Sequence, residues 1–218
     1  MLEFNLLQKM IIWIIPVVFA ITLHEVAHGY VANHFGDPTA KFLGRLTLNP
    51  LNHIDLLGTI IIPASLYLLG GFIFGWAKPV PVDWRNLRNP RRDGALVALA
   101  GPFANLIMAV LWAIVIKAGI LLHNSGVLSG DVLVAMGMIG VSINLLLMVL
   151  NLIPIPPLDG SRILSSFLSP RTSVRYNRIE PYGFLILLAL MATGLLSNFM
   201  MPLVVSLQTL LIKYISLI

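Results

Sequence analysis

The sequence predicts an all-α polytopic membrane protein with about five transmembrane helices and a re-entrant or β-hairpin segment between the first and second spans. Of the 218 residues, 58% are hydrophobic and only 11% are charged, whereas about 25% are charged in an ordinary soluble domain. The apolar residues form long runs, and such runs exclude a disordered chain. Because we find no internal repeat or polar linker, we interpret residues 1–218 as a single membrane-embedded domain.

Five apolar segments are long enough to cross the ~30 Å hydrocarbon core as helices, the open-chain structure that satisfies its own backbone groups in lipid. They are Leu7–Phe35, Gly94–Leu122, Val132–Ile153, Gly183–Met200 and Leu203–Ile218. The last is the weakest because it is short and contains Lys213. A sixth run, Leu56–Gly75, is interrupted by four glycines and a proline. Such a broken backbone is typical of a re-entrant hairpin.

The basic residues lie mainly in the loops. Eleven of the 14 Lys and Arg fall in 36–55, 76–93 and 156–180, and the positive-inside rule makes these loops cytoplasmic if the sixth run enters and leaves by one face. Charge alone does not decide that point. We expect no nucleic-acid partner, because the charges stand in short loops between apolar runs. The chain has no cysteine, so any metal must be held by nitrogen and oxygen.

The first predicted span contains His24-Glu25-Val26-Ala27-His28, an HExxH pattern whose chance expectation in this composition is roughly 0.002. On a helix the two imidazoles lie one turn apart and can share a zinc ion, while Glu25 can act as general base. Core histidines or a proton relay are the alternatives. Three ionisable groups in mid-span cost ~2.5–3.5 kcal/mol each, which favours a compensating metal.

A catalytic zinc needs a third protein ligand. Glu3 and Glu180 are the other glutamates, but Asp159 is the better candidate. It belongs to Asn151-Leu-Ile-Pro-Ile-Pro-Pro-Leu-Asp159-Gly160, where prolines break the end of a span and deliver a carboxylate. The alternative interpretation of this segment is a plain exit turn.

Together, these two motifs resemble the site-2 protease family of intramembrane zinc metalloproteases, in a minimal form without PDZ or CBS domains. The resemblance covers a catalytic core of about residues 6–164, with C-terminal helices at about 182–218. It implies one Zn²⁺ per chain held by His24, His28 and Asp159, Glu25 as catalytic base, and Asn151 as a contact of the substrate backbone.

Two further segments are similar to family patterns. Ala100-Gly101-Pro102 with Asn105 resembles the AGPxxN pattern, and Ser161 stands where the family more often has a second glycine. Gly75-Trp76-Ala77-Lys78-Pro79-Val80-Pro81-Val82 resembles a membrane-associated β-hairpin that presents the substrate. The resemblance thus implies four substrate contacts here: Trp76, Lys78, Pro79 and Val80. Interfacial anchoring is an equal alternative for Trp76.

The metal also predicts the topology. Bonds of ~2.0–2.2 Å require the three ligands to lie at one membrane depth, so the first span and Val132–Ile153 should run parallel. We therefore expect a re-entrant Leu56–Gly75, an active site on the cytoplasmic side and an external N-terminus.

Several polar residues have open roles. Asn144, seven residues before Asn151, can hydrogen-bond to another helix or to a substrate. His53 resembles an NPxxHID pattern of one subgroup, and it is either a group near the site mouth that supports the metal ligands or a solvated loop histidine. Gly101 is an alternative candidate for a close helix contact.

The predicted function is hydrolysis of peptide bonds within transmembrane segments of membrane proteins or remnant signal peptides, as in regulated intramembrane proteolysis. Zinc would activate water and polarise the scissile carbonyl, and Glu25 would move the proton. The expected partners are a transmembrane protein or peptide and the lipid bilayer of a bacterial or archaeal cell membrane. The alternatives are a proton-coupled carrier that uses the intramembrane His and Glu, and a catalytically silent relative that binds transmembrane partners.

Overall fold

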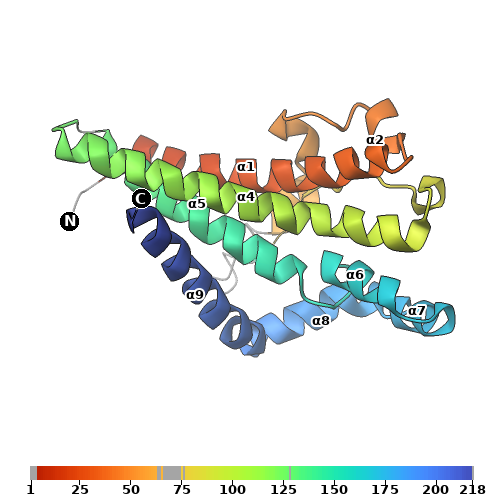
Figure 1. Cartoon of the computed structure of the whole chain (residues 1–218). Coiled ribbons are helices and arrows are strands. Elements are labelled where there is room, and N and C mark those ends of the chain that lie inside the picture. Colours follow the sequence, from red (N-terminus) through yellow and green to blue (C-terminus); the bar gives the residue numbers. More distant parts are fainter. Residues whose placement is uncertain (1–3, 63–64, 66–74, 76, 128, 218) are drawn as a thin grey trace.

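The computed structural model describes residues 4–62, 65, 75, 77–127 and 129–217, and in this part of the chain it is helical without a strand. Three long helices lie side by side: α1 (Leu6–His34), α4 (Pro90–Asn124) and α5 (Gly130–Asn151). Figure 1 shows that α4 runs back along α1 and that α5 then runs in the same direction as α1. The predicted parallel course of these two spans is confirmed.

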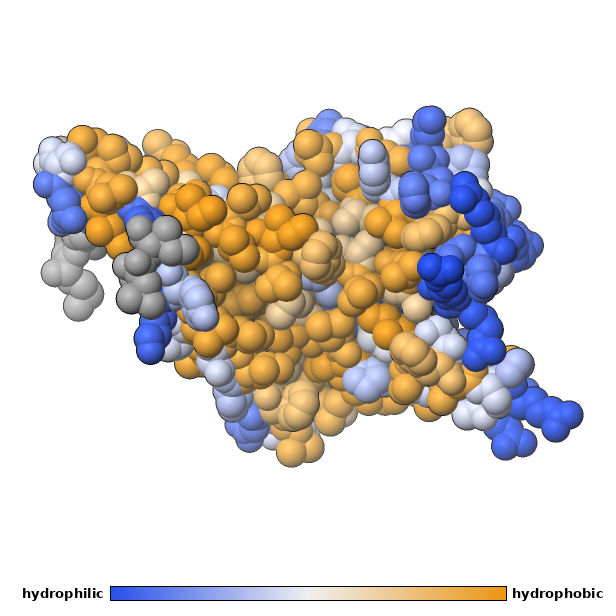
Figure 2. Space-filling view, in the orientation of Figure 1, coloured by the Kyte–Doolittle hydropathy of each residue, from blue (hydrophilic) through white to orange (hydrophobic). Residues whose placement is uncertain are grey.

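The polar residues gather at one end of this bundle. The last turns of α1 lie there with four shorter elements, namely α2 (Thr39–Phe42), η3 (Trp84–Asn86), α6 (Asp159–Phe167) and α7 (Pro170–Asn177). Figure 2 shows hydrophilic residues at this end and a broad hydrophobic surface over the middle of the bundle. An apolar surface of this kind is what contact with lipid requires.

Four helices of the described residues are long and apolar enough to cross a membrane, namely α1, α4, α5 and α9 (Leu195–Leu217). The expected fourth span, Gly183–Met200, is replaced by α8 (Glu180–Ala192) and the start of α9. The 13 residues of α8 reach only about 20 Å at 1.5 Å per residue. The predicted boundary near Pro202 is therefore wrong.

The chain instead breaks at Gly194. This residue has a φ of +72°, a left-handed conformation that glycine adopts without the steric cost of a Cβ. Pro202 lies inside α9 as its eighth residue, where it removes one i→i−4 hydrogen bond without ending the helix. The helix break thus follows the glycine instead of the proline.

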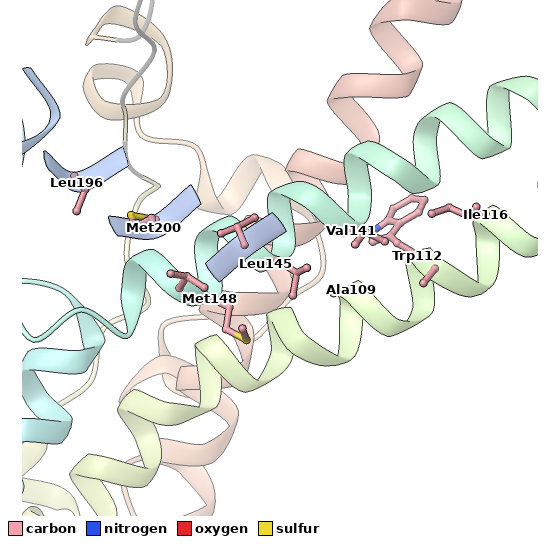
Figure 3. Packing of buried hydrophobic residues seen from close by; sticks show 11 residues of the cluster. Ala109, Trp112, Ile116, Val141, Leu145, Met148, Leu196 and Met200 are labelled. Atoms are coloured by element: carbon pink, nitrogen blue, oxygen red, sulfur yellow. The ribbon is translucent and has the colours of Figure 1, made fainter. Parts of the chain in front are cut away.

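The largest hydrophobic cluster joins α4, α5 and α9 (Figure 3). Trp112 and Ala109 of α4 pack with Val141 and Leu145 of α5, and Met200 extends the cluster to α9. Leu145 is 1% exposed, and truncation of such a side chain to alanine costs roughly 2–5 kcal/mol. This packing holds α5 against α4 and thereby fixes the position in space of the C-terminal end of α5.

The segment between α1 and α4 is irregular. It contains the short helices η1 (Pro50–His53) and η2 (Leu56–Ile61), the latter of π type. Most of the predicted re-entrant run Leu56–Gly75 and all of Trp76 lie outside the described residues. Residues 77–83, which we call the strap, follow with no helix or strand assigned. The predicted β-hairpin at Gly75–Val82 is therefore not formed over its described part.

Candidate metal centre and active site

Three potential ligand atoms converge where α1 meets the start of α6. His24 and His28 lie one turn apart on α1, and their Nε2 atoms are 3.1 Å from each other. Asp159 Oδ2 lies 3.2 Å from His24 Nε2 and 3.3 Å from His28 Nε2. Two ligands of a tetrahedral zinc at ~2.0–2.1 Å are roughly 3.3–3.4 Å apart. The triangle thus has the size that a zinc ion requires.

The turn after α5 delivers Asp159 to this position. The helix ends at Asn151, and the proline-containing residues 152–158 lead directly into α6, whose first residue is Asp159. Gly160 permits a close approach here, because a Cβ at this residue would lie 2.6 Å from the Ile153 carbonyl oxygen. Since α5 runs parallel to α1, its end lies at the depth of the two histidines.

Hydrogen bonds orient both imidazoles. His28 Nδ1 is 2.7 Å from the Val97 carbonyl oxygen, and His24 Nδ1 is 2.6 Å from Asn105 Oδ1. Both acceptors lie on α4, and an oxygen of this kind can only accept. Each Nδ1 therefore carries the proton, which leaves the lone pair of each Nε2 directed into the site.

These residues fit a divalent cation. Asp159 Oδ2 is buried and accepts no hydrogen bond from the described residues, although two Nε2 lone pairs lie beside it. Electron-rich atoms in such contact need a positive charge between them. Gly101 leaves the necessary room, because a Cβ there would lie 2.6 Å from His24 Nε2. The set of two imidazoles and one carboxylate is typical of catalytic zinc.

Glu25 lies beside this centre, and its carboxylate is hydrogen-bonded to the strap. Its Oε2 accepts a hydrogen bond of 2.8 Å from the backbone N–H of Val80. A cavity of about 400 Å³ is lined by the three candidate ligands together with Glu25, Pro79, Val80 and Asn151. A water or a peptide in this cavity can therefore reach both the metal position and the Glu25 carboxylate.

The two asparagines of α5 occupy different environments. Asn151 lines the cavity, and its Nδ2 donates to the Leu147 carbonyl of its own helix at 2.9 Å. Asn144 is fully buried and hydrogen-bonds to Asn105. It is not among the described residues that line the cavity, so the structure brings it to a neighbouring helix.

The two remaining candidates are Lys78, which belongs to the strap, and His53, which is hydrogen-bonded to it. Lys78 is exposed, and its backbone N–H donates to the His53 carbonyl at 2.9 Å. His53 is 2% exposed, and its Nε2 lies 2.9 Å from the Thr47 carbonyl. His53 is thus a buried residue beneath the strap, neither solvated nor among the described residues around the three ligand atoms.

Sequence reasoning missed two contacts of the centre. An asparagine in an apolar span signals a buried polar function, and Asn105, four residues after Gly101, proves to bond to His24. The second contact is the bond from Val80 to Glu25. Pro79 and Pro81 have no N–H, so Val80 is the only possible backbone donor of the tripeptide Pro79-Val80-Pro81. These patterns are visible in the sequence, but their partners depend on the packing of α4 and the strap.

Fold and site together define a multi-pass membrane protein in which an HExxH motif and an aspartate form a candidate metal centre. The sequence profile of peptidase family M50 matches residues 119–194. YwhC of Bacillus subtilis, named as a candidate zinc metalloprotease, is 41% identical over 196 residues, which cover 87% of this chain and 84% of YwhC. The chain therefore belongs to peptidase family M50, the site-2 protease family that its motifs predict.

Two more distant relatives carry similar names. Rip2 of Mycolicibacterium smegmatis is 34% identical over 188 residues, or 86% of this chain and 69% of Rip2. MJ0611 of Methanocaldococcus jannaschii is 29% identical over 160 residues, or 71% of this chain and 69% of MJ0611. Both are named as candidate zinc metalloproteases. No solved structure matches the chain significantly.

Proposed function

We propose that this protein is an intramembrane zinc endopeptidase that cleaves transmembrane segments of membrane proteins or remnant signal peptides. The observation that carries the proposal is the triangle of His24, His28 and Asp159 in one cavity with Glu25. The family and the names of the relatives support zinc as the metal. The four apolar helices support a site embedded in the bilayer.

The chemistry is shared between the metal and Glu25. Bound zinc would polarise the scissile carbonyl and lower the pKa of a water in the site. Glu25 takes a proton from the attacking water and passes it to the nitrogen of the departing chain, a transfer that typically contributes 10²–10⁴-fold to the rate. His24 and His28 serve only to hold the metal, since their Nδ1 protons are engaged by Asn105 and Val97.

The substrate must unwind to react, because the carbonyls of a helix are already hydrogen-bonded and shielded. We assign the binding of the unwound segment to Asn151, Lys78, Pro79 and Val80. We add Trp76, which lies outside the described residues. Asn151, Pro79 and Val80 line the cavity that contains Glu25. An extended substrate beside the strap would exchange helical hydrogen bonds for strand-type ones.

We place the active site on the cytoplasmic side of a bacterial or archaeal cell membrane. The metal centre lies toward the polar end of the bundle, where α2, α6 and α7 gather (Figure 2). Eleven of the 14 basic residues belong to the loops that the sequence assigns to one face, and the positive-inside rule makes that face cytoplasmic.

The test combines metal analysis with cleavage of a model transmembrane peptide. The wild-type protein should contain one zinc per chain, and Glu25→Gln should retain it while losing cleavage by 10²-fold or more. Ser142→Ala is a matched control, because Ser142 lies on α5 and its hydroxyl donates to the Met138 carbonyl of the same helix. A wild-type protein that binds no zinc, or a Glu25→Gln variant that cleaves normally, would overturn the proposal and favour a carrier or a silent binder.

A further inference from the structure

Two asparagines are buried inside the apolar helix bundle beside the metal centre. Asn105 of α4 and Asn144 of α5 are both 0% exposed. Burial of an amide costs several kcal/mol unless its donors and acceptors are paired. Both side chains are therefore expected to have a defined hydrogen-bond arrangement, and the structure provides one that spans three helices.

The direction of each hydrogen bond in this arrangement is fixed by backbone carbonyls, which can only accept. Asn144 Nδ2 donates to the Gly140 carbonyl at 2.8 Å. Its Oδ1 is then left to accept from Asn105 Nδ2 at 2.9 Å. The same Nδ2 also donates to the Ala20 carbonyl of α1 at 3.2 Å. Both hydrogens of the Asn105 amide are thereby used.

The end of this chain of bonds is His24. Because Asn105 Nδ2 is committed to Ala20 and Asn144, its Oδ1 must face His24 Nδ1, at 2.6 Å. An amide oxygen only accepts, so His24 has to donate from Nδ1. A neutral imidazole has one N–H, and its proton on Nδ1 leaves Nε2 as the free ligand atom.

We propose that Asn144, acting through Asn105, is a positioning residue that fixes the tautomer and ring orientation of the zinc ligand His24. The inference rests on the proposed function and adds a residue that touches neither the metal position nor the substrate cavity. His28 needs no such device, because a backbone carbonyl, that of Val97, accepts from its Nδ1 directly. The hydrogen-bonded series Asn144–Asn105–His24, which we call the relay, lets α5 control the geometry of a ligand on α1.

The relay should act on metal affinity. Partners of metal-ligating histidines typically change affinity by 10–100-fold when they are removed. Without Asn144, the NH₂ group of Asn105 keeps only its 3.2 Å bond to the Ala20 carbonyl, and its second hydrogen is unpaired. The amide can then rotate and present Nδ2 to His24. That arrangement favours the tautomer with its proton on Nε2, which leaves no lone pair on the ring nitrogen that faces the metal position.

The experiment measures zinc affinity by competition with a chromophoric chelator, and unfolding temperature after chelation, in detergent micelles. Asn144→Leu should weaken zinc binding about 10-fold or more, and Asn105→Leu at least as much. In the Asn105→Leu background, Asn144→Leu should have no further effect on zinc affinity, because the relay is already broken. Ser142→Ala, which removes a comparable bond of 2.8 Å on the same helix, should bind zinc as the wild type does.

Asn144→Ser guards against a folding defect of the leucine variant. Its hydroxyl can still donate to the Gly140 carbonyl, as Ser142 does to Met138, but it is too short to accept from Asn105. It should therefore weaken zinc binding like Asn144→Leu. The relay is overturned if either Asn144 variant folds and binds zinc with wild-type affinity, or if the effects of Asn105→Leu and Asn144→Leu multiply. If the wild type itself binds no zinc, the proposed function fails as well.

Discussion

The backbone N–H of Val80 donates a hydrogen bond of 2.8 Å to Glu25 Oε2 and so joins the strap to the candidate general base. Val80 is 6% exposed, and a Cβ at Gly29 of α1 would lie 2.7 Å from its Cγ1. The strap is also held at Asp83, whose N–H donates to Asp37 Oδ2 at 2.7 Å. The position of the strap therefore sets the orientation of the Glu25 carboxylate.

Removal of this N–H should lower the cleavage rate without loss of metal. Val80→Pro deletes the donor, and Val80 already precedes a proline, which favours the extended backbone that a run of prolines adopts. A hydrogen bond to a charged group contributes about 1.5–3 kcal/mol, so kcat should fall roughly 10–100-fold. Val80→Ala keeps the N–H and loses only side-chain packing. Equal kcat values for the two variants, measured with a transmembrane peptide, would show that the bond does not matter.

Asp37 anchors the other end of the strap and should make stability depend on pH. It lies just after α1, is 0% exposed, and accepts hydrogen bonds from Thr39, Asn86 and Asp83. Burial opposes its ionisation, but these donors outweigh burial and lower the pKa of Asp37 below the ordinary 3.8. The carboxylate thus stabilises the folded state above pH 3.8, and this contribution is lost as the pH falls through the lower folded-state pKa.

Asp37→Asn tests this anchor. Asparagine offers one acceptor oxygen where the carboxylate offers two, so a donor at Thr39 or Asp83 is left facing an amide NH₂. We expect a loss of about 1–3 kcal/mol at neutral pH, measured as a lower unfolding temperature. The difference from the wild type should shrink as the pH is lowered below 3.8. A constant difference down to the lowest accessible pH would argue against the anchor.

Gly101 should be required for metal binding because of its distance from the ligands. In Gly101→Ala the new Cβ would lie 2.6 Å from both Nε2 and Cε1 of His24, so the imidazole must move. We expect zinc affinity to fall at least 10-fold. Gly119→Ala on the same helix is the matched control, because its Cβ would crowd Val134 and Gly130 of α5 at 2.8–2.9 Å. It should lower stability and leave zinc affinity unchanged. Similar zinc affinities for the two variants would contradict this role of Gly101.

The third ligand can be identified by comparing two acids that line the same cavity, Asp159 and Glu180. Asp159 Oδ2 lies 3.2–3.3 Å from both histidines, whereas Glu180 Oε1 lies 3.5 Å from Arg162. Asp159→Ala should therefore lose zinc in a metal analysis, and Glu180→Ala should retain it. If Asp159→Ala retained zinc and Glu180→Ala lost it, the third ligand would be Glu180 and our assignment of Asp159 would be wrong.

The parallel course of α1 and α5 was predictable from chemistry, because residues that share a metal must lie at one depth. The C-terminal helices were predicted less well. Hydropathy gives no clear boundary inside the apolar run 183–218, and the two expected spans, Gly183–Met200 and Leu203–Ile218, were separated at residues 201–202. Gly194 is the actual break, because a left-handed residue ends a helix, whereas α9 continues through Pro202 with the loss of one backbone hydrogen bond.

The candidate ligands and base were predictable because their spacing within each motif is local. Their supporting groups were not. Asn144 could be assigned either to a substrate or to another helix, and only the packing of α5 on α4 brings it to Asn105. The predicted hairpin at Gly75–Val82 was assigned strand geometry, yet Val80 donates to a side chain of α1 instead of to a strand.

The sequence by itself determined that this protein lies in lipid and that it carries two imidazoles, a neighbouring glutamate and a proline-delivered aspartate. Composition and short motifs contain that information because helix periodicity and lipid solvation act locally. The tertiary structure decided which groups hold those residues in place: Asn105 and Val97 on the imidazoles, Val80 on the glutamate, and Gly101 beneath the metal position. These contacts join segments that are distant in the chain, so only the packing of the helices and the strap could fix them.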